Sequence, residues 1–436
     1  MAALRNTTAY LKYLHAHEKS LTRLYDEGRY IAFEESYQWI ESRVRELNHS
    51  ASSYKVVVNQ FADWSQHEIS QMFPVFNYST DRVRNSGVPA GWEALGSVGP
   101  GLEGRDQSSF SGSLNWATDH NPQGVSVVAG PRNQGMCGAC WAFVAAGSAE
   151  GAVGISTGRP VTLSVQELID CSTEFNRGCN GGNPMFAYDY IREYGLSLWK
   201  EYPYADLQNP SCQSTAGYTK AMINYDLQVP PDDEVELKWY VSRGPVAIGV
   251  CGTDLDFMYY GGGIFDSPRC CSAQNHAMLI VGYGVDADSD TPYWVVQNSW
   301  GSFWGEGGYI RIKRSTVRGG GAGVCGLATF STMAVGGHLI AGNSSKHADS
   351  TSTIGEWLLD HNEQIISVFA AACFLLSIAL LILSYWFSCR RRESERSARE
   401  AAVSRIKMDA VRYGSHLQSN CFHFNFNRNY QESSKQ

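Results

Sequence analysis

The ten residues from Gln134 to Phe143 constrain this chain more than any other stretch. They read Gln-Gly-Met-Cys-Gly-Ala-Cys-Trp-Ala-Phe, and a run rich in helix formers continues to Glu150. Cys140 therefore lies at the expected start of a helix, directly after two small residues that suit a tight turn. A thiol reacts as thiolate, and a helix N-terminus with a histidine cation nearby lowers its pKa from ~8.5 to roughly 3.5–7.5. The segment therefore predicts a nucleophilic cysteine.

A histidine and an asparagine follow this cysteine in two further segments. His276 lies in Gln-Asn-His-Ala-Met-Leu-Ile-Val-Gly-Tyr-Gly, and Asn298 lies in Tyr-Trp-Val-Val-Gln-Asn-Ser-Trp-Gly. They come roughly 130–150 residues after Cys-Gly-Ala-Cys-Trp, the separation that this cysteine signature predicts. In order and spacing the three segments resemble the cysteine, histidine and asparagine blocks of papain-like cysteine peptidases. The resemblance covers most of residues 113–335.

The resemblance implies a role for each polar residue of these segments. Cys140 would attack a peptide carbonyl, and His276 would act first as base and then as acid. Asn298 would fix the imidazole ring, and Trp300 would shield it from water. Gln134 would donate its side-chain N–H to the oxyanion together with the Cys140 backbone N–H. The expected activity is that of a cysteine endopeptidase that needs no metal and no cofactor.

Other interpretations remain open at this point. Cys137 and Cys140 could form a thioredoxin-like redox pair, but no short βαβ context surrounds them. They could be half of a zinc site, but no second Cys/His pair follows at finger spacing. The fold could also have lost its activity, or serve a membrane receptor or adhesion protein that binds peptides in its cleft. Within the enzyme class, an amine could intercept the acyl-enzyme, which would make the protein a peptide ligase.

The expected architecture is a papain-like two-domain α+β fold. The segment 163–171 has a serine cap and an apolar 3/4 pattern typical of a second helix. Residues from about 229 to 330 are rich in Val, Ile, Tyr and Gly with turn punctuation, which predicts a β-barrel-like domain. The active site would lie in the cleft between the two domains.

The same resemblance implies a disulfide pattern. The implied pairs are Cys137–Cys179, Cys171–Cys212 and a bridge from Cys325 to Cys270 or Cys271. We prefer Cys270 for that third bridge, which leaves Cys251 either free or paired with Cys271. Twelve cysteines in the chain point to an oxidising compartment.

The family pattern also predicts a substrate pocket. Gly182 would bind an extended peptide through main-chain hydrogen bonds, because glycine lets a substrate approach the backbone. The pocket for the second residue before the cut would be lined by Asn183, Pro184, Met185, Gly249, Gln274 and Ala277, with Phe330 at its base. A phenyl group there shortens the pocket and no acid is present to receive arginine, so Val, Leu or Pro should be preferred to Phe or Arg.

Residues 1–76 are expected to form a helical inhibitory pro-region. Residues 9–47 are charged and have apolar residues at spacings of three and four. They resemble the pro-region helix of cathepsin L-type zymogens, with Arg29, Phe33 and Ile40 at family positions, whereas Tyr25, Ser36 and Val44 depart from the pattern. The segment 57–63 resembles a second pro-region segment through Asn59, Phe61 and Asp63. An ordinary helical subdomain is the alternative.

A linker over 77–112 separates this part from the peptidase domain, expected over 113–335. The linker is rich in Gly, Ser, Pro and Asn and has little periodicity. Maturation cleavage should fall in it, shortly before Leu114, because Leu114-Asn-Trp116 resembles the start of mature family members.

The C-terminal part predicts a membrane anchor. A Gly-, Ser- and Thr-rich stalk over 336–364 precedes Ile365–Cys389, a run of 25 residues without a charge that is long enough to cross a bilayer. A buried core helix is the alternative. The tail over 390–436 begins with three arginines, has 10 basic and 5 acidic residues, and so carries +5. Positive charge marks the cytoplasmic side, which places the catalytic part in the lumen of a lysosome- or vacuole-like compartment or outside the cell.

Two further observations concern this topology. Four glycosylation triplets, none of them after the anchor, begin at Asn6, Asn48, Asn77 and Asn343. The N-terminus has no apolar core of the kind a signal peptide needs, so we expect a leader upstream of Met1.

Residues 113–334 contain 13 basic and 21 acidic residues, a net charge of −8, and so have no basic patch of the kind that binds nucleic acid. The expected partners are peptide substrates and the chain's own pro-region, and a monomer is expected.

Overall fold

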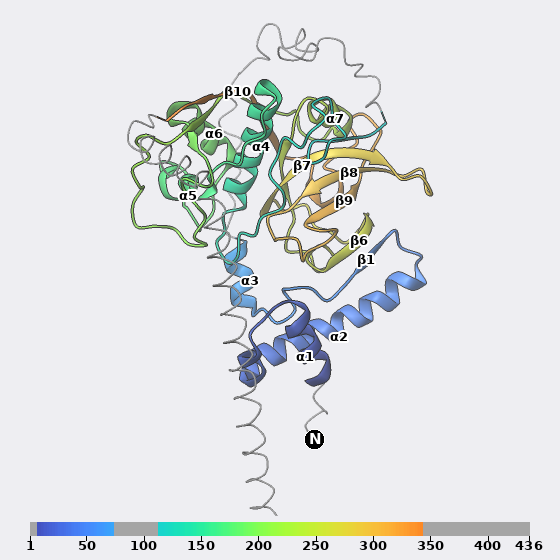
Figure 1. Ribbon diagram of the computed structural model, residues 1–436. Coiled ribbons are helices and arrows are strands. Elements are labelled where there is room, and N and C mark those ends of the chain that lie inside the picture. Colours follow the sequence, from blue (N-terminus) through green and yellow to red (C-terminus); the bar gives the residue numbers. More distant parts are fainter. Residues whose placement is uncertain (1–6, 74–111, 343–436) are drawn as a thin grey trace, which may run out of the picture. The chain divides into compact units, whose positions relative to one another are not determined.

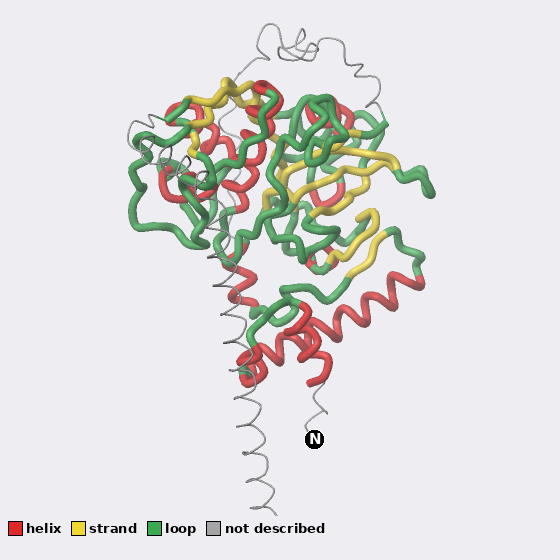
Figure 2. The backbone as a smooth tube through the Cα atoms, viewed as in Figure 1, coloured by secondary structure: helices red, strands yellow, loops and turns green. Residues whose placement is uncertain are grey.

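The computed structural model in Figure 1 describes residues 7–73 and 112–342. The apolar run, the basic tail, most of the stalk and most of the linker lie outside this range. Among the described residues, no helix is both long and apolar enough to span a bilayer. Figure 2 shows a helical layer, a strand-rich layer and an N-terminal helical part.

The N-terminal part holds four helices and one short strand. The helical pattern of 9–47 is divided in the structure, because the Asp26 side chain accepts a hydrogen bond from the Arg29 N–H and begins a new helix there. The elements are α1 (Thr7–Ala16), η1 (Leu21–Tyr25), α2 (Glu27–His49), β1 (Tyr54–Val56) and α3 (Gln66–Met72).

Three ion pairs hold these helices together, and the Asp63 carboxylate that makes two of them is fully buried. Asp63 accepts a hydrogen bond from Arg23 of η1 at 2.7 Å and pairs with Lys19. Burial alone would raise the pKa of Asp63, but these cations hold it below its usual range. Arg29 in α2 forms a two-point contact with Glu68 in α3. Arg29 therefore joins α2 to α3, and Asp63, just before α3, joins this segment to η1.

The helical layer is organised around one fully buried helix. In α4 every residue from Cys140 to Gly154 is buried. A Cβ on Gly151 would lie 2.5 Å from the Pro245 ring, so the glycine lets the strand layer approach the helix closely. The helices of this layer are α4 (Cys140–Thr157), α5 (Val165–Cys171) and α6 (Pro184–Tyr194).

The strand layer is one sheet with the order β1-β6-β9-β8-β7-β5-β10-β4-β3, and β2 pairs with β7. Its centre is β7, which is buried from His276 to Gly284 between antiparallel partners β5 and β8. The strands are β2 (Leu114–Asn115), β3 (Leu196–Ser197), β4 (Lys220–Gln228), β5 (Val246–Val250), β6 (Tyr260–Phe265), β7 (His276–Val285), β8 (Pro292–Gln297), β9 (Tyr309–Lys313) and β10 (Ser331–Ile340). Short helices α7 (Glu234–Val241), α8 (Leu255–Met258) and η3 (Val324–Gly326) lie between them.

The N-terminal part is joined to this sheet by strand pairing. β1 adds antiparallel to β6, with Tyr54 opposite Gly263. Gly263 has φ +88°, and a Cβ there would lie 2.3 Å from the Ser53 carbonyl oxygen. Only glycine admits β1 at this distance, so the N-terminal part extends the sheet by one strand.

The last strand, β10, is one of the longest of the sheet. It runs from Ser331 to Ile340 and pairs with β4 down to Lys220. Gly336 within it has φ +63°, a left-handed conformation that favours glycine.

Four disulfides link the described cysteines. Three are the pairs Cys137–Cys179, Cys171–Cys212 and Cys270–Cys325. The fourth joins Cys251 to Cys271, so the adjacent residues 270 and 271 form separate bridges. Cys140 is the free cysteine of the described part of the chain.

Candidate active site

Cys140 is the first residue of α4 and is completely buried. The residue before it, Ala139, makes no side-chain cap, so the first backbone N–H groups of the helix are left for other acceptors. The backbone N–H groups of Ala277, Trp141 and Cys140 itself act on the thiol and lower its pKa. Since Ala277 is the second residue of β7, the sulfur lies near the start of that strand, next to His276 in the chain.

His276 and Asn298 meet because their strands are neighbours. His276 begins β7, Asn298 follows the last residue of β8, and the two strands pair antiparallel. His276 Nε2 lies 2.8 Å from Asn298 Oδ1. Trp300 stacks on the imidazole at 4.7 Å between ring centroids and is itself buried. This geometry holds the ring by one edge and one face and excludes water from both.

The fourth expected polar residue, Gln134, is buried between the two layers. Its Nε2 donates to the Cys137 carbonyl at 2.9 Å, which places the amide one turn before Cys140. Its Oε1 accepts a 2.5 Å hydrogen bond from the Ser299 hydroxyl. The amide nitrogen carries two N–H bonds, and the one not donated to the Cys137 carbonyl remains for another acceptor.

The N-terminal part covers this group of residues. Phe73, the residue after α3, packs edge-on against both His276 at 5.7 Å and Trp300 at 5.8 Å. Phe61 packs edge-on against Trp300 at 5.1 Å. The Gln60 side chain donates a 2.8 Å hydrogen bond to the Trp300 carbonyl. Together these residues close the site to solvent.

Closure changes the protonation of the site. Burial raises the pKa of the Cys140 thiol to about 11, although three backbone N–H groups partly offset it. Burial also lowers the pKa of His276 to about 4, against a smaller opposite effect of Asn298. Both shifts favour the uncharged thiol and imidazole over the thiolate–imidazolium pair that thiol catalysis needs.

The residues expected to bind substrate lie on both layers. Gly249 in β5 is opposite Ala277 in β7, and the Gly249 N–H donates to the Phe330 carbonyl at 3.0 Å. Gln274 instead donates its amide to the Gly326 carbonyl. The remaining residues of the predicted wall, Asn183, Pro184 and Met185, lie at the start of α6 in the helical layer.

Gly182 precedes these α6 residues, and its side-chain position is filled by neighbours. A Cβ there would lie 2.5 Å from Asn176 Oδ1 and 2.7 Å from the Trp141 ring. The site therefore requires glycine at this position for packing, whatever the backbone binds.

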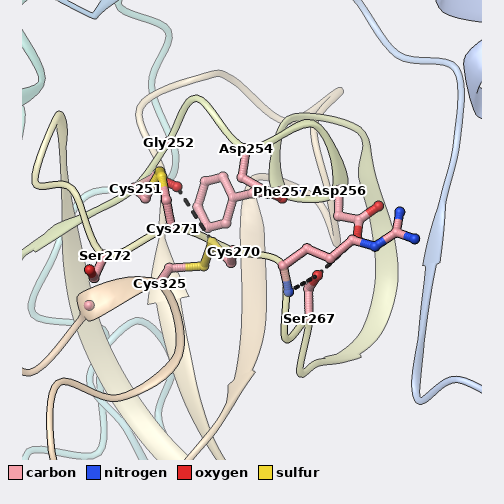
Figure 3. The surroundings of a disulfide bond; sticks show 12 residues. Cys251, Gly252, Asp254, Asp256, Phe257, Ser267, Cys270, Cys271, Ser272 and Cys325 are labelled. Carbon is pink, nitrogen blue, oxygen red and sulfur yellow. Dashed lines mark hydrogen bonds between the residues drawn. A yellow bond between two sulfur atoms is a disulfide. The ribbon is translucent and has the colours of Figure 1, made fainter.

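Figure 3 shows the loop that carries the fourth disulfide. Gly252, next to Cys251, would place a Cβ 2.6 Å from Phe73 and 2.7 Å from His276. Its N–H donates to the Asn275 side chain at 2.8 Å, and Asn275 in turn donates to the Val250 carbonyl. The Cys251–Cys271 bridge thus fastens a loop that forms one wall beside the imidazole.

Sequence reasoning missed two residues that shape the site. Ser299 orients the Gln134 amide, and its position beside Asn298 was the available signal. Phe73 closes the site over His276, and its position at the end of the N-terminal helices was a weaker signal.

Of the glycosylation triplets, Asn48 is exposed on α2, whereas Asn6, Asn77 and Asn343 lie outside the described residues. The expected cleavage region lies outside them too.

Comparisons with known proteins agree with this geometry. Residues 112–335 match the model of the papain family cysteine proteases. Cysteine protease XCP2 of Arabidopsis thaliana is 35% identical over 337 residues, covering 73% of this chain and 88% of that protein. Cathepsin L1 of Drosophila melanogaster is 31% identical over 320 residues, covering 72% and 79%.

Solved proforms extend the likeness to the N-terminal part. Digestive procathepsin L 3 of Tenebrio molitor larval midgut is 27% identical with a TM-score of 0.60, covering 76% of this chain and 99% of that one. The proform of the ragweed pollen protease Amb a 11 is 28% identical with a TM-score of 0.58, covering 76% and 92%. The part over residues 7–73 is therefore an inhibitory pro-region, and the chain belongs to the papain family of cysteine proteases as a cathepsin L-like endopeptidase zymogen.

Proposed function

We propose that the protein is a membrane-tethered zymogen in which Cys140, His276, Asn298 and Gln134 carry out peptide-bond cleavage. The observation that carries the catalytic assignment is the meeting of the three segments. The N–H of Ala277, the residue after His276, lowers the pKa of the Cys140 thiol, and His276 Nε2 lies 2.8 Å from Asn298 Oδ1. Nδ1 of His276 has no hydrogen-bond partner in the described part of the chain, and serves as the proton acceptor for the thiol.

The reaction starts when the pro-region leaves. Water then reaches Cys140 and His276, both pKa shifts caused by burial relax, and the proton moves from sulfur to imidazole. The thiolate attacks the carbonyl carbon, and the negative charge on the carbonyl oxygen is met by the Cys140 N–H and the Gln134 amide. The imidazolium protonates the leaving amine and so becomes neutral imidazole. The neutral ring then acts as a base and activates the water that hydrolyses the thioester.

The substrate preference follows from the expected pocket. Gly249, Ala277 and Phe330 belong to adjoining backbone segments, and Asn183, Pro184 and Met185 supply the facing wall. The pocket contains no acidic side chain. We propose Val, Leu or Pro as the preferred second residue before the cut. A peptide library in which Arg or Phe ranks first at that position would exclude this assignment.

The membrane assignment rests on the sequence. The run Ile365–Cys389, followed by three arginines, supports an anchor with the catalytic domain on the lumenal or outer side, in a lysosome- or vacuole-like compartment or at the cell surface. A protease-protection experiment on sealed vesicles, which compares digestion of the 390–436 tail with digestion of the peptidase domain, tests this topology. Digestion of the tail from outside the vesicle together with protection of the peptidase domain supports the topology, and the reverse pattern contradicts it.

One experiment tests the catalytic assignment directly. The full chain is treated at acidic pH and then with a broad thiol-directed epoxide, and the labelled site is mapped by mass spectrometry. We expect one label, on Cys140, after the pro-region is released, and none on Cys140→Ala. A folded, processed protein in which Cys140 stays unlabelled would falsify the assignment.

A further inference from the structure

A groove of about 780 Å³ runs along α6 on the helical layer, away from the catalytic residues. We call it the α6 groove. One side is formed by residues 171–175, which follow α5, and the other by the part of α6 from Phe186 to Tyr194. It includes the Cys171–Cys212 bridge, which fixes its floor.

Aromatic rings line this groove in two pairs. Phe175 and Phe186 lie 4.9 Å apart, and Tyr190 and Tyr194 lie 5.1 Å apart. Phe175 is 46% exposed and Tyr194 is 58% exposed, which is unusual for side chains of this size. Aromatic faces of this kind bind the guanidinium of arginine or the ammonium of lysine.

The charge of the groove is acidic. Its lining contains Glu174, Asp189 and Glu193, and a single cation, Arg192. Arg192 is occupied by Asp189 and Asp226, whereas Glu174 and Glu193 form no ion pair with any described residue. Both of these carboxylates raise the pKa of Tyr194, chiefly through its hydrogen bond with Glu193, so they lie close to that ring. The groove therefore offers two unpaired carboxylates beside an exposed aromatic face.

The α6 groove adjoins residues of the proposed substrate site. Ser172, on the groove, accepts a hydrogen bond from Asn176, and Asn176 accepts one from the Asn183 N–H at 2.7 Å. Asn183 caps α6 beside Gly182, where an extended peptide is expected to bind. The groove begins with Phe186, one residue after Met185 of the predicted pocket wall.

We propose that the α6 groove is an exosite that binds Lys and Arg side chains of a protein substrate, on the N-terminal side of the cut. This proposal rests on the proposed function. α6 has 11 residues and is ~16 Å long, which an extended chain covers in about five residues. Since Gly182 and Asn183 would hold the second and third residues before the cut, the basic side chains belong at about the sixth to eighth.

The test uses the activated enzyme and two peptides that differ at those three positions, one carrying Lys-Arg-Lys and the other Gln-Gln-Gln. We expect kcat/KM to be about tenfold higher for the basic peptide, through KM, with an advantage that shrinks in 0.5 M salt. The double variant Glu174→Gln/Glu193→Gln and the single variant Tyr194→Leu should each reduce this ratio. The matched control is Asp288→Asn/Asp290→Asn, which removes two exposed charges from the β7–β8 turn and should leave the ratio unchanged.

Equal kcat/KM values for the two peptides, or a ratio that the groove variants do not change, overturn the proposal. Anisotropy of a labelled Lys-Arg-Lys peptide measures binding without cleavage. If this peptide binds in the groove but basic substrates gain no advantage, the groove serves another partner and the exosite proposal fails. The proposed mechanism is judged separately, since the Gln-Gln-Gln peptide must be cleaved by Cys140 whether or not the groove binds anything.

Discussion

Two of the places where the pro-region holds the peptidase domain differ in chemistry. At the active site the contact is aromatic, with Phe61 and Phe73 against Trp300 and His276. At the far end of α2 it is ionic. Arg43 donates two 2.6 Å hydrogen bonds to Asp256 on the peptidase domain.

The ionic contact is nearly as dry as the aromatic one. Arg43 is 6% exposed and Asp256 is 3% exposed, and Asp256 also accepts hydrogen bonds from Tyr54 and Ser267. Burial alone would raise the pKa of Asp256, but these donors, Arg43 first, hold it below its usual range. The comparison teaches that the two contacts inhibit in different ways. The aromatic contact keeps the active site inactive by excluding water. The ionic contact fixes the position of the pro-region, because the buried Asp256 carboxylate needs Arg43 as its counter-charge.

The largest expected effect is the loss of Arg43. Arg43→Met leaves Asp256 buried without a counter-charge, which typically costs about 3–5 kcal/mol and favours release of the pro-region by roughly 10²- to 4 × 10³-fold. The rate at which an epoxide labels Cys140 in the intact zymogen measures this. Arg45→Met, an exposed change on the same helix, is the control. The double variant Arg43→Met/Asp256→Asn should recover part of the loss, and its failure to do so would contradict the pairing.

Acidification should open the aromatic end before the ionic end. The pKa of His276 is about 4 in the closed form and ~6.5 when released, so the released form gains a proton first as pH falls below ~6.5. Between pH ~6.5 and ~4 the free energy that favours the closed form therefore falls by about 3 kcal/mol in total. Asp256 has a lowered pKa in the closed form, so its contribution is present above the ordinary carboxyl range of ~4 and is lost below it.

Hydrogen exchange of the α3 amides between pH 3 and 7, on a Cys140→Ala background, separates the two steps. His276→Asn should remove the step between pH ~6.5 and ~4, and Asp256→Asn should remove the lower one. Exchange that is independent of pH over the upper range would exclude the role assigned to the imidazole.

The aromatic end by itself should have a smaller effect than Arg43. Phe73→Ala removes two edge-on ring contacts, each typically worth about 0.5–1.5 kcal/mol, so closure weakens by about 1–3 kcal/mol. Because water then reaches the imidazole, the pKa of His276 should rise toward its usual value. NMR titration of the ring measures this, with Phe73→Leu as a variant that keeps the site dry. A pKa that stays near 4 in Phe73→Ala would show that another group closes the site.

The smallest effect is expected at the exposed rim of the ionic end. Arg269 pairs with Glu46 at 2.6 Å, but the two side chains are 57% and 52% exposed. Arg269→Gln should change the labelling rate by less than about fivefold, because exposed pairs contribute ~0–1 kcal/mol. A change as large as that of Arg43→Met would remove the distinction between buried and exposed pairs at this interface.

Local sequence patterns were enough to single out the proposed catalytic residues, because their neighbours along the chain carry the signal. Cys140, His276 and Asn298 each lie in a distinctive segment, and the helix start after Ala139 could be recognised from composition. The order of pro-region, linker and peptidase domain followed from the same segments.

Features that depend on distant contacts were not accessible in this way. Arg43 and Asp256 are 213 residues apart, and nothing around Arg43 distinguishes it from the other charges of α2. The break of the first helical run depends on the Asp26 cap, which competes with a continuous apolar pattern. The extension of β10 to Ile340 depends on pairing with β4, across two glycines that weaken the strand pattern.

The adjacent cysteines 270 and 271 have a consequence for how this protein is made. Cys270 bridges to Cys325 and Cys271 to Cys251, and an exchange of these partners would shift the connection by one residue along the segment that leads to His276. Such a shift would alternate which side of the segment faces the loop at Gly252. An oxidising environment in which the chain folds would therefore have to select between two adjacent thiols, and we expect the exchanged pairing to displace the segment that leads to His276.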